Sequence, residues 1–305
     1  MRLWFNLAPE RGDPDAASEM SAGYDLVQLK NGTWSVRSVA EGETFHPVVG
    51  PVAEAEALYV RQLNLAERAR QAGKGPLVLW DVGLGAAANV LTALRALVPT
   101  DRAVTVLSFD HTLEPLRFAF ERREQLGYFG GFESVLETLL RDGRVRCAKT
   151  PLPLEWQVLT ADFPTALATP EAEHWPPPHG ILFDAFSPAR NPAMWTLPLF
   201  TRLRQLTRPD RPCSLATYSR ATLLRVTLLR AGWFVGVGHA TGEKDETTVA
   251  ANVPELIAEP LGRNWLERAR RSTSAEPLTK AEYRQRPLSP ESWEALNRHP
   301  QFQAV

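Results

Sequence analysis

The chain has 305 residues, of which 44% are hydrophobic and 23% are charged, and its formal net charge is -1. These values are typical of a globular protein with one large or two modest domains. They exclude the strongly basic balance that attracts nucleic acid over a distance, so any nucleic-acid partner must be held by a local patch. Cys147 and Cys213 lack the paired spacing of a zinc site or a disulfide scaffold, which fits a reducing compartment.

The sequence contains no segment that predicts secretion or membrane insertion. Its first ten residues, M-R-L-W-F-N-L-A-P-E, have no sustained apolar run, and no stretch approaches the roughly 18 apolar residues of a spanning helix. We therefore expect a cytoplasmic protein with no membrane partner.

An N-terminal extension is predicted over residues 1–75. Apolar residues flank an Asn31–Gly32 turn within 24–39, a pattern typical of a β-hairpin. A helix is predicted over 53–71, where alanine, glutamate, leucine and arginine dominate, and the Gly75–Pro76 pair ends it.

Strands and helices alternate over the central region, residues 76–253. Strands are predicted at 77–82, 103–109, 156–160, 180–186 and 214–218, and helices at 87–97, 113–125, 132–141, 194–206 and 221–231. Such alternation predicts a mostly parallel, doubly wound α/β sheet. Two further strands, 233–239 and 247–252, are predicted to form an antiparallel hairpin at its edge, an ending that favours a class I methyltransferase over a dehydrogenase.

The segment 77–89, L-V-L-W-D-V-G-L-G-A-A-A-N, predicts a strand that leads into a nucleotide-binding turn. Gly83 and Gly85 allow a sharp turn and close approach of a ligand to the following helix N-terminus. A dinucleotide such as NAD or FAD is one interpretation, with Gly83, Gly85 and Ala88 as a G-x-G-x-x-A fingerprint. However, Asp81 would lie near its anionic pyrophosphate, whereas S-adenosylmethionine carries an ammonium and a sulfonium group, so the acid favours S-adenosylmethionine. A glycine turn without a ligand is the third interpretation.

Acidic residues are predicted at the carboxyl ends of four successive strands, where ligands bind in such sheets. They are Asp81, Asp110, Asp162 and Asp184. A helix N-cap or a solvated loop position is the alternative for each acid taken singly. Asp184 lies within the apolar run I-L-F-D-A-F, where an unused carboxylate would be costly.

The loop after Asp184 combines prolines with aromatic residues. Pro188 would stiffen it, and Phe186 and Trp195 could offer flat surfaces to a planar substrate. A proline-rich connection whose aromatics pack in the core is the alternative. His46, His111 and His239 are too scattered to predict a metal site.

The segment F-D-A-F-S-P-A-R-N-P-A-M-W at 183–195 resembles the motif of the tRNA 5-aminomethyluridine methyltransferases, both the stand-alone MnmD type and the methyltransferase half of the MnmC type. Other segments occur in the same order as in that family: the hairpin after Tyr24, G-x-x-x-H-P-x-x-G-P-x-x-E-A-E at 42–56, D-V-G-L-G-A-A-A-N, R-A-G-W-F, and G-E-K-D-E-T-T-V-A. The resemblance covers about residues 24–252.

The resemblance implies a Rossmann-like class I fold and methyl transfer from S-adenosylmethionine to the exocyclic amine of 5-aminomethyl(-2-thio)uridine at the tRNA wobble position. It assigns Asp184 to catalysis. The residues that it assigns to the methyl donor are Asp81, Gly83, Gly85 and Asn89 at the methionine end, Asp110 at the ribose and Asp162 at the adenine. The residues that it assigns to the substrate are Phe186, Pro188, Asn191, Trp195 and Lys244.

The C-terminal region and the substrate each allow more than one interpretation. Residues 254–305 form a polar, arginine-containing tail with Trp265, Tyr283 and Trp293, which predicts either RNA contact or a helical tail that packs its tryptophans on the core. We expect no flavin oxidase domain in this chain. A methyltransferase for a small molecule or protein, and a non-catalytic nucleotide-binding protein, are the alternative functions.

Overall fold

The computed structural model describes residues 23–71, 75–149, 151–242 and 245–303. Its central sheet has eight strands in the order β10-β11-β9-β8-β4-β5-β7-β6. The parallel strands are β4 (Leu77–Val82), β5 (Val104–Asp110), β7 (Leu154–Thr160), β8 (Gly180–Phe183) and β9 (Ser214–Thr217). β6 (Arg144–Cys147) pairs antiparallel with β7, and β11 (Thr247–Ala251) pairs antiparallel with both β9 and β10 (Phe234–Gly238). The predicted doubly wound sheet with a closing hairpin is confirmed.

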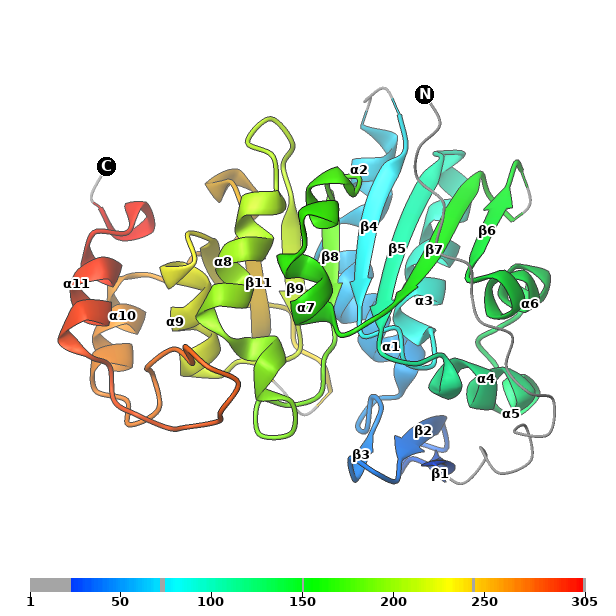
Figure 1. Cartoon of the computed structure of the whole chain (residues 1–305), viewed down its shortest axis with the longest axis horizontal. Helices are drawn as coiled ribbons and strands as arrows, with labels where there is room; N and C mark the ends of the chain where they lie inside the picture. Colours follow the sequence, from blue (N-terminus) through cyan, green and yellow to red (C-terminus); the bar gives the residue numbers. More distant parts are fainter. Residues whose placement is uncertain (1–22, 72–74, 150, 243–244, 304–305) are drawn as a thin grey trace.

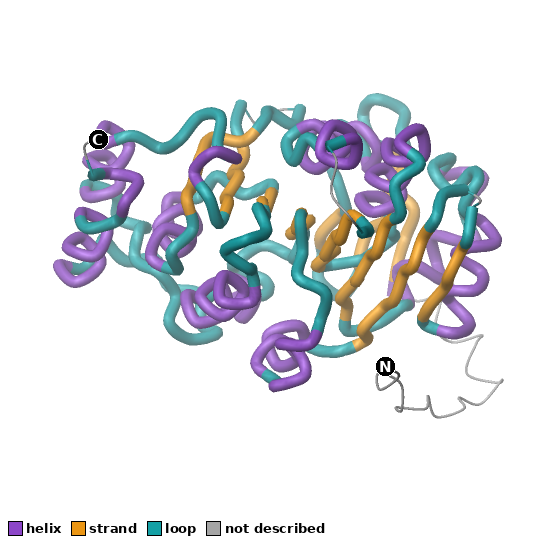
Figure 2. The backbone as a smooth tube through the Cα atoms, turned by 90° about the horizontal axis from the view of Figure 1, so that it is seen from above, coloured by secondary structure: helices purple, strands orange, loops and turns teal. Residues whose placement is uncertain are grey.

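Helices cover both faces of this sheet (Figure 2). They include α3 (Ala88–Leu97), α4 (Glu114–Glu121), α5 (Arg123–Leu126), α6 (Glu133–Asp142), α7 (Phe163–Ala168), α8 (Leu197–Leu206) and α9 (Thr222–Arg230). Successive residues of a strand point to opposite faces. In β4, Leu77 and Leu79 therefore pack with α3, while Val78 and Trp80 belong to a second core with α8 and α9.

A small sheet precedes the core. The predicted hairpin is confirmed as β1 (Tyr24–Gln28) and β2 (Trp34–Ser38), and the short strand β3 (Glu43–Thr44) joins it. In Figure 1 this sheet lies at the end of the central sheet from which α4 leaves. The small sheet therefore faces the carboxyl ends of the parallel strands.

Three predicted segments differ in the structure. The helix predicted over 53–71 is divided into α1 (Pro51–Ala55), the π-helical η3 (Glu56–Arg61) and α2 (Leu65–Arg70), and Asn64 takes φ 50° between the last two. The helix predicted over 113–125 breaks at Arg122. The strand predicted to end at residue 186 ends at Phe183, so Asp184 follows β8 instead of lying within it.

Several short elements were not predicted. β6 is an edge strand in which charged residues alternate with Val145 and Cys147, and it forms only through pairing with β7. α7, α10 (Arg263–Arg270) and α11 (Pro290–Asn297) are eight residues long or less, so their apolar periodicity is too brief to stand out.

The region after residue 253 packs on the second core. Trp265, Leu266 and Leu296 are buried there, and Figure 1 shows α10 and α11 beyond α9. Gln301 accepts a hydrogen bond from the Val235 backbone N–H at 2.7 Å and donates to the Val235 carbonyl, covering the edge of β10. Of the two interpretations of the tail, packing of its tryptophans is what the structure shows.

Within the described residues, no helix is both long enough and apolar enough to cross a membrane. This holds for the helices on both faces of the central sheet and for those of the C-terminal region.

Candidate active site

A cavity of about 560 Å³ opens at the carboxyl ends of the parallel strands. Most of the lining comes from the turn after β4, from the residues that follow β5, β7 and β8, and from the segment around β3. The polar lining residues are Tyr24, Glu41, Glu43, Thr44, His46, Glu54, Asn89, Asp110, His111, Asp162, Asp184, Ser187, Arg190, Asn191 and Tyr218. The volume is typical of a small-molecule site.

The glycine turn after β4 lines the cavity and packs against the backbone of Asp184. Gly83 has φ +90°, and a Cβ atom there would lie 2.5 Å from the Asp184 carbonyl oxygen. Close packing of two backbones is therefore one reason for glycine at this position. The Gly85 N–H donates to Asp110 Oδ2 at 2.9 Å, and the first turn of α3 supplies Asn89, whose Nδ2 donates to Asp184 Oδ2 at 2.7 Å. The turn and the start of α3 thus hold the carboxylates of Asp110 and Asp184.

Asp81 lies inside β4, behind the turn, and does not line the cavity. Its Oδ2 accepts a hydrogen bond from Ser108 at 2.7 Å, and its buried Oδ1 has no hydrogen-bond partner among the described residues. Burial raises the pKa of this carboxyl to about 7, although the Ser108 hydrogen bond opposes the rise. A direct contact between Asp81 and a ligand, as predicted, would require the turn to move, so we expect this residue to act through its charge.

Asp110 and Asp162 both line the cavity. Asp110 Oδ1 lies 3.2 Å from His111 Nδ1, and this hydrogen bond raises the pKa of His111. Asp162 Oδ2 accepts hydrogen bonds from the Thr165 N–H at 3.0 Å and from its hydroxyl at 2.5 Å, which makes Asp162 the N-cap of α7. The structure thus shows Asp162 as a helix N-cap, as the alternative interpretation predicted. Because Asp162 also lines the cavity, contact with a ligand stays a proposal.

Asp184 lies in a cluster of polar side chains, with 18% of its own side chain exposed. His46 Nε2 is 3.7 Å from Asp184 Oδ2, and Glu54 Oε2 is 3.9 Å from His46 Nδ1. Burial raises the pKa of Asp184, and Glu54 adds to the rise, while His46, Asn89 and Tyr59 lower it. His46 and Glu54 belong to the G-x-x-x-H-P-x-x-G-P-x-x-E segment, but sequence analysis did not assign them to the site.

Two phenylalanine rings meet over the cavity. Phe45 and Phe186 both line it, with ring centroids 5.9 Å apart and an interplanar angle of 54°. Asn191 also lines it, whereas Pro188 does not. Lys244 lies outside the described residues.

Trp195 does not line the cavity, so its predicted contact with the substrate is wrong. Its side chain is fully buried, its Nε1 donates to the Phe186 carbonyl at 2.8 Å, and its ring packs against Phe183. The core-aromatic alternative therefore applies to Trp195, which holds the backbone of Phe186 in place.

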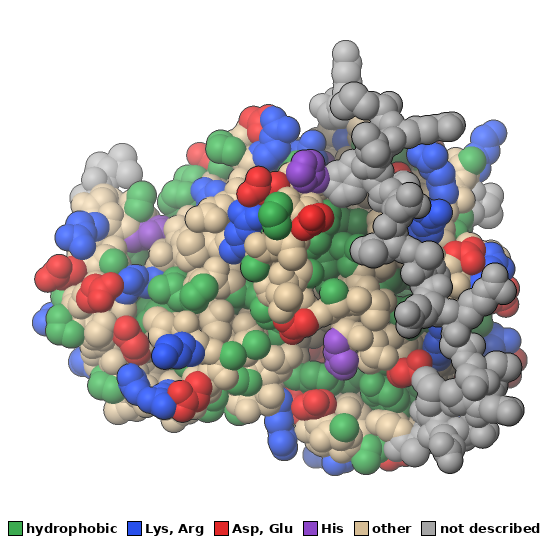
Figure 3. All heavy atoms as spheres, viewed as in Figure 1, with side chains coloured by type: hydrophobic (Ala, Val, Ile, Leu, Met, Phe, Trp, Pro, Cys, Tyr) green, Lys and Arg blue, Asp and Glu red, His purple; other side chains and the backbone are tan. Residues whose placement is uncertain are grey.

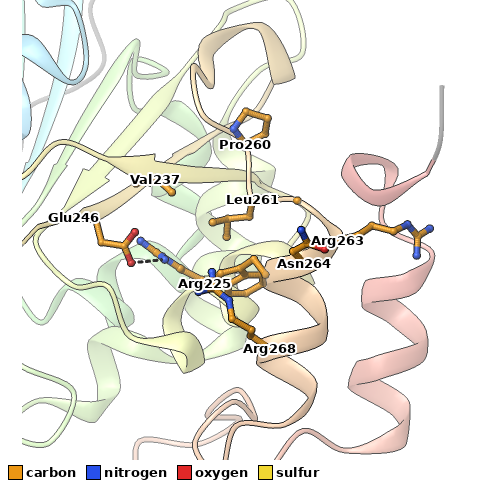
Figure 4. A pocket seen from close by; sticks show the side chains of 10 residues that line it. Arg225, Val237, Glu246, Pro260, Leu261, Arg263, Asn264 and Arg268 are labelled. Atoms are coloured by element: carbon orange, nitrogen blue, oxygen red, sulfur yellow. Dashed lines mark hydrogen bonds and ion pairs between the residues drawn. The ribbon is translucent and has the colours of Figure 1, made fainter.

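A second cavity, of about 490 Å³, lies between the β10–β11 hairpin and α10 (Figure 4). The Arg225 side chain points into it but is already engaged. Its nitrogens donate to Thr248 Oγ1, Glu246 Oε1 and the Thr247 carbonyl at 3.1, 3.1 and 2.7 Å. This arrangement anchors the hairpin, whereas Asp110, Asp162 and Asp184 lie at the first cavity.

Comparison with known proteins bears directly on this site. Residues 155–253, which include Asp162 and Asp184, match the model of a family described as S-adenosyl-L-methionine-dependent methyltransferase. The match spans about a third of the chain, and it shows an S-adenosyl-L-methionine-dependent methyltransferase. The cofactor prediction is thereby confirmed.

Individual relatives agree with the predicted resemblance. The chain is 28% identical over 255 residues to the tRNA 5-methylaminomethyl-2-thiouridine biosynthesis bifunctional protein MnmC of Methylibium petroleiphilum, covering 73% of this chain and 34% of that protein. It is 36% identical over 88 residues to the MnmC protein of Aeromonas hydrophila, covering 26% of this chain and 13% of that protein. The chain thus spans about a third, or less, of these relatives.

The crystal structure of MNMC2 from Aquifex aeolicus has the same fold. It superposes with a TM-score of 0.66 at 22% identity, covering 90% of this chain and 82% of that chain. The class I methyltransferase fold is confirmed.

The cavity of this methyltransferase fits a cationic methyl donor better than a dinucleotide. Among the described residues, six carboxylates line it, against one arginine. Asn89 lines this wall, and its buried Oδ1 has no hydrogen-bond partner among the described residues. We propose that Asn89, Asp110 and Asp162 hold the donor, in the roles that the resemblance implies.

Asp81→Asn is expected to stabilise the ligand-free methyltransferase at alkaline pH. Because the folded-state pKa of Asp81 is about 7, above its ordinary value of 3.8, the folded protein binds the extra proton between about pH 4 and 7. The parent therefore loses stability as pH rises from about 4 to 7 and stays at the lower level above 7, and the variant does not. The gain at pH 8 should exceed that at pH 5 by about 2–3 kcal/mol.

Urea unfolding at pH 5, 6.5 and 8 measures this difference, and a gain that does not depend on pH would contradict it. The control is Asp210→Asn, because Arg208 lowers the pKa of that exposed carboxyl and no alkaline gain is expected. We also expect Asp81→Asn to weaken binding of the methyl donor about tenfold, since a buried charge near the cationic groups is lost.

Proposed function

We propose that this methyltransferase methylates the exocyclic amine of 5-aminomethyluridine, or of its 2-thio form, at the wobble position of tRNA. The name of the MnmC relatives specifies 5-methylaminomethyl-2-thiouridine, a product that carries one N-methyl group more than the 5-aminomethyl compound. The observation that carries the proposal is the position of Asp184. A carboxylate lies at the wall of the cavity beside two aromatic rings, where a cationic amine on a planar base can bind.

In this proposal, Asp184 binds the substrate amine and orients it for attack. An aliphatic amine with a pKa of about 10.4 is mostly protonated at neutral pH and has no lone pair for attack. The Asp184 carboxylate accepts a hydrogen bond from the amine and directs its lone pair, while Asn89 holds the carboxylate at 2.7 Å. The bound donor supplies a methyl group on a positively charged sulfur.

The aromatic pair provides a place for the base. A wobble uridine must leave the anticodon stack to reach a recessed methyl group. Phe186 offers a ring for stacking, and Phe45 closes the cavity from the N-terminal sheet. Ser187 Oγ donates to Glu43 Oε1 at 2.7 Å and so connects the substrate loop to that sheet. Together these contacts hold the substrate loop against the N-terminal sheet.

Because positive and negative side chains are mixed on this surface (Figure 3), we expect RNA to be recognised by local contacts. On the face shown in Figure 3, Lys and Arg side chains are interspersed with acidic ones. Arg190 lines the cavity mouth and lies beside Gly42, where it can contact a phosphate. We propose that binding depends on such local contacts, and that the protein acts in the cytoplasm on free tRNA.

Methyl transfer to tRNA tests the proposal directly. Bulk tRNA from a strain that lacks this modification is incubated with the protein and S-adenosylmethionine labelled in its methyl group, and the nucleosides are then analysed. We expect label in 5-methylaminomethyluridine or its 2-thio form. Binding of the donor without label in tRNA would contradict the substrate but not the methyltransferase family, and label in small molecules or protein would identify the alternative.

A further inference from the structure

His46 stands between two carboxylates in the cavity wall. Its Nε2 lies 3.7 Å from Asp184 Oδ2 and its Nδ1 lies 3.9 Å from Glu54 Oε2, and 8% of each of the His46 and Glu54 side chains is exposed. These are ion-pair distances, longer than direct hydrogen bonds. A proton gained by the imidazole would be stabilised by both neighbours.

The backbone of His46 is held in an unfavourable conformation. Its φ is +49°, which is uncommon for a residue other than glycine, and the following Pro47 restricts it further. The preceding residue is fixed on both sides, because the Phe45 N–H donates to the Val36 carbonyl at 2.8 Å and the Phe45 carbonyl accepts a hydrogen bond from the Ser35 hydroxyl. Strain that the surroundings impose in this way is characteristic of functional sites.

The other ionisable groups of the cluster are less suited to receive a proton at neutral pH. Tyr59, from η3, and Tyr218, after β9, have their pKa values raised by burial and then by Asp184, so both remain protonated phenols. Asp184 and Glu54 face the imidazole from the loop after β8 and from α1, and Asn89 adds a neutral amide. Imidazole has the ordinary pKa nearest to neutrality among these groups.

We propose that His46 accepts the proton that the substrate amine must lose before methyl transfer, with Asp184 orienting the amine and Glu54 stabilising the imidazolium. This inference rests on the proposed function. In the step, an N–H bond of the substrate ammonium breaks and its electron pair remains on the amine nitrogen. A new N–H bond forms on the imidazole, either directly or through Asp184, and the imidazolium later releases the proton to water.

The variant His46→Gly removes the imidazole without adding backbone strain, because glycine adopts positive φ without cost. It also leaves a space of imidazole size. With tRNA as substrate and saturating donor, we expect kcat to fall about 100-fold, the Kd for S-adenosylmethionine to change less than threefold, and added imidazole to restore at least a tenth of the lost activity. His239→Asn, an exposed histidine outside the cavity, is the control.

The pH profile gives a readout that a structural role would not change. In the parent, kcat should rise with pH as His46 becomes able to accept a proton, and His46→Gly should lack this rise. Glu54→Gln should move the rise to lower pH, because one of the carboxylates that stabilise the imidazolium is lost.

An unchanged kcat and pH profile in His46→Gly, or a loss of activity that imidazole does not rescue, would overturn the role of His46. A parent protein that binds the donor but does not methylate tRNA would instead overturn the proposed function, and this inference with it.

Discussion

Asp184→Asn is expected to lower methyl transfer to tRNA by about 10³-fold and to leave the affinity for S-adenosylmethionine within a few-fold. Asparagine keeps the size of the side chain and an oxygen that can accept the 2.7 Å hydrogen bond from Asn89. It removes the negative charge that binds and orients the cationic amine. Because burial raises the pKa of Asp184, the carboxylate is also a better proton acceptor than an ordinary aspartate.

Single-turnover methylation and titration calorimetry with S-adenosylmethionine measure the two quantities separately. Asp142→Asn is the matched control, since it neutralises an exposed carboxylate that pairs with Arg141 at the end of α6. Turnover of Asp184→Asn within tenfold of the parent would remove Asp184 from the mechanism. A parallel loss of donor affinity would instead assign Asp184 to donor binding.

Gly83→Ala is expected to destabilise the protein by about 3 kcal/mol or more and to abolish binding of the methyl donor. An added Cβ would lie 2.5 Å from the Asp184 carbonyl oxygen and 3.0 Å from its carbonyl carbon, so one backbone must move. The positive φ of +90° adds strain for any residue with a side chain. The same displacement moves Asp184, so both halves of the site are affected.

The control separates steric overlap from backbone strain. Gly131 has a similar φ of +86°, but nothing lies within 4 Å of a Cβ built there. Gly131→Ala should therefore cost only about 1–2 kcal/mol and retain donor binding. Chemical denaturation and donor titration of both variants test this difference, and equal losses of stability in the two would show that the contact with Asp184 is unimportant.

Local sequence patterns determined the central sheet and the position of its ligand-binding edge. Alternating apolar strands and amphipathic helices specify a parallel sheet because each strand must bury two faces, as β4 does with Leu79 and Trp80. The glycine turn and the acids after successive strands follow from the chain direction alone, which explains why Asp110, Asp162 and Asp184 line one cavity.

Short edge elements and helix interruptions were less predictable. β6 depends on pairing with β7, and the break at Asn64 lies between Leu63 and Leu65, which are both buried. Such features are decided by tertiary contacts that outweigh weak local preferences.

The sequence by itself determined the class of fold, the glycine turn and the nature of the acidic site, because these depend on residue periodicity and chain direction. Only the tertiary structure decided which remote groups complete the site. It places His46 and Glu54 of the N-terminal extension against Asp184, and it buries Trp195 behind Phe186 instead of in the cavity. The physical reason is that residues more than a hundred positions apart meet only when the chain buries its apolar faces.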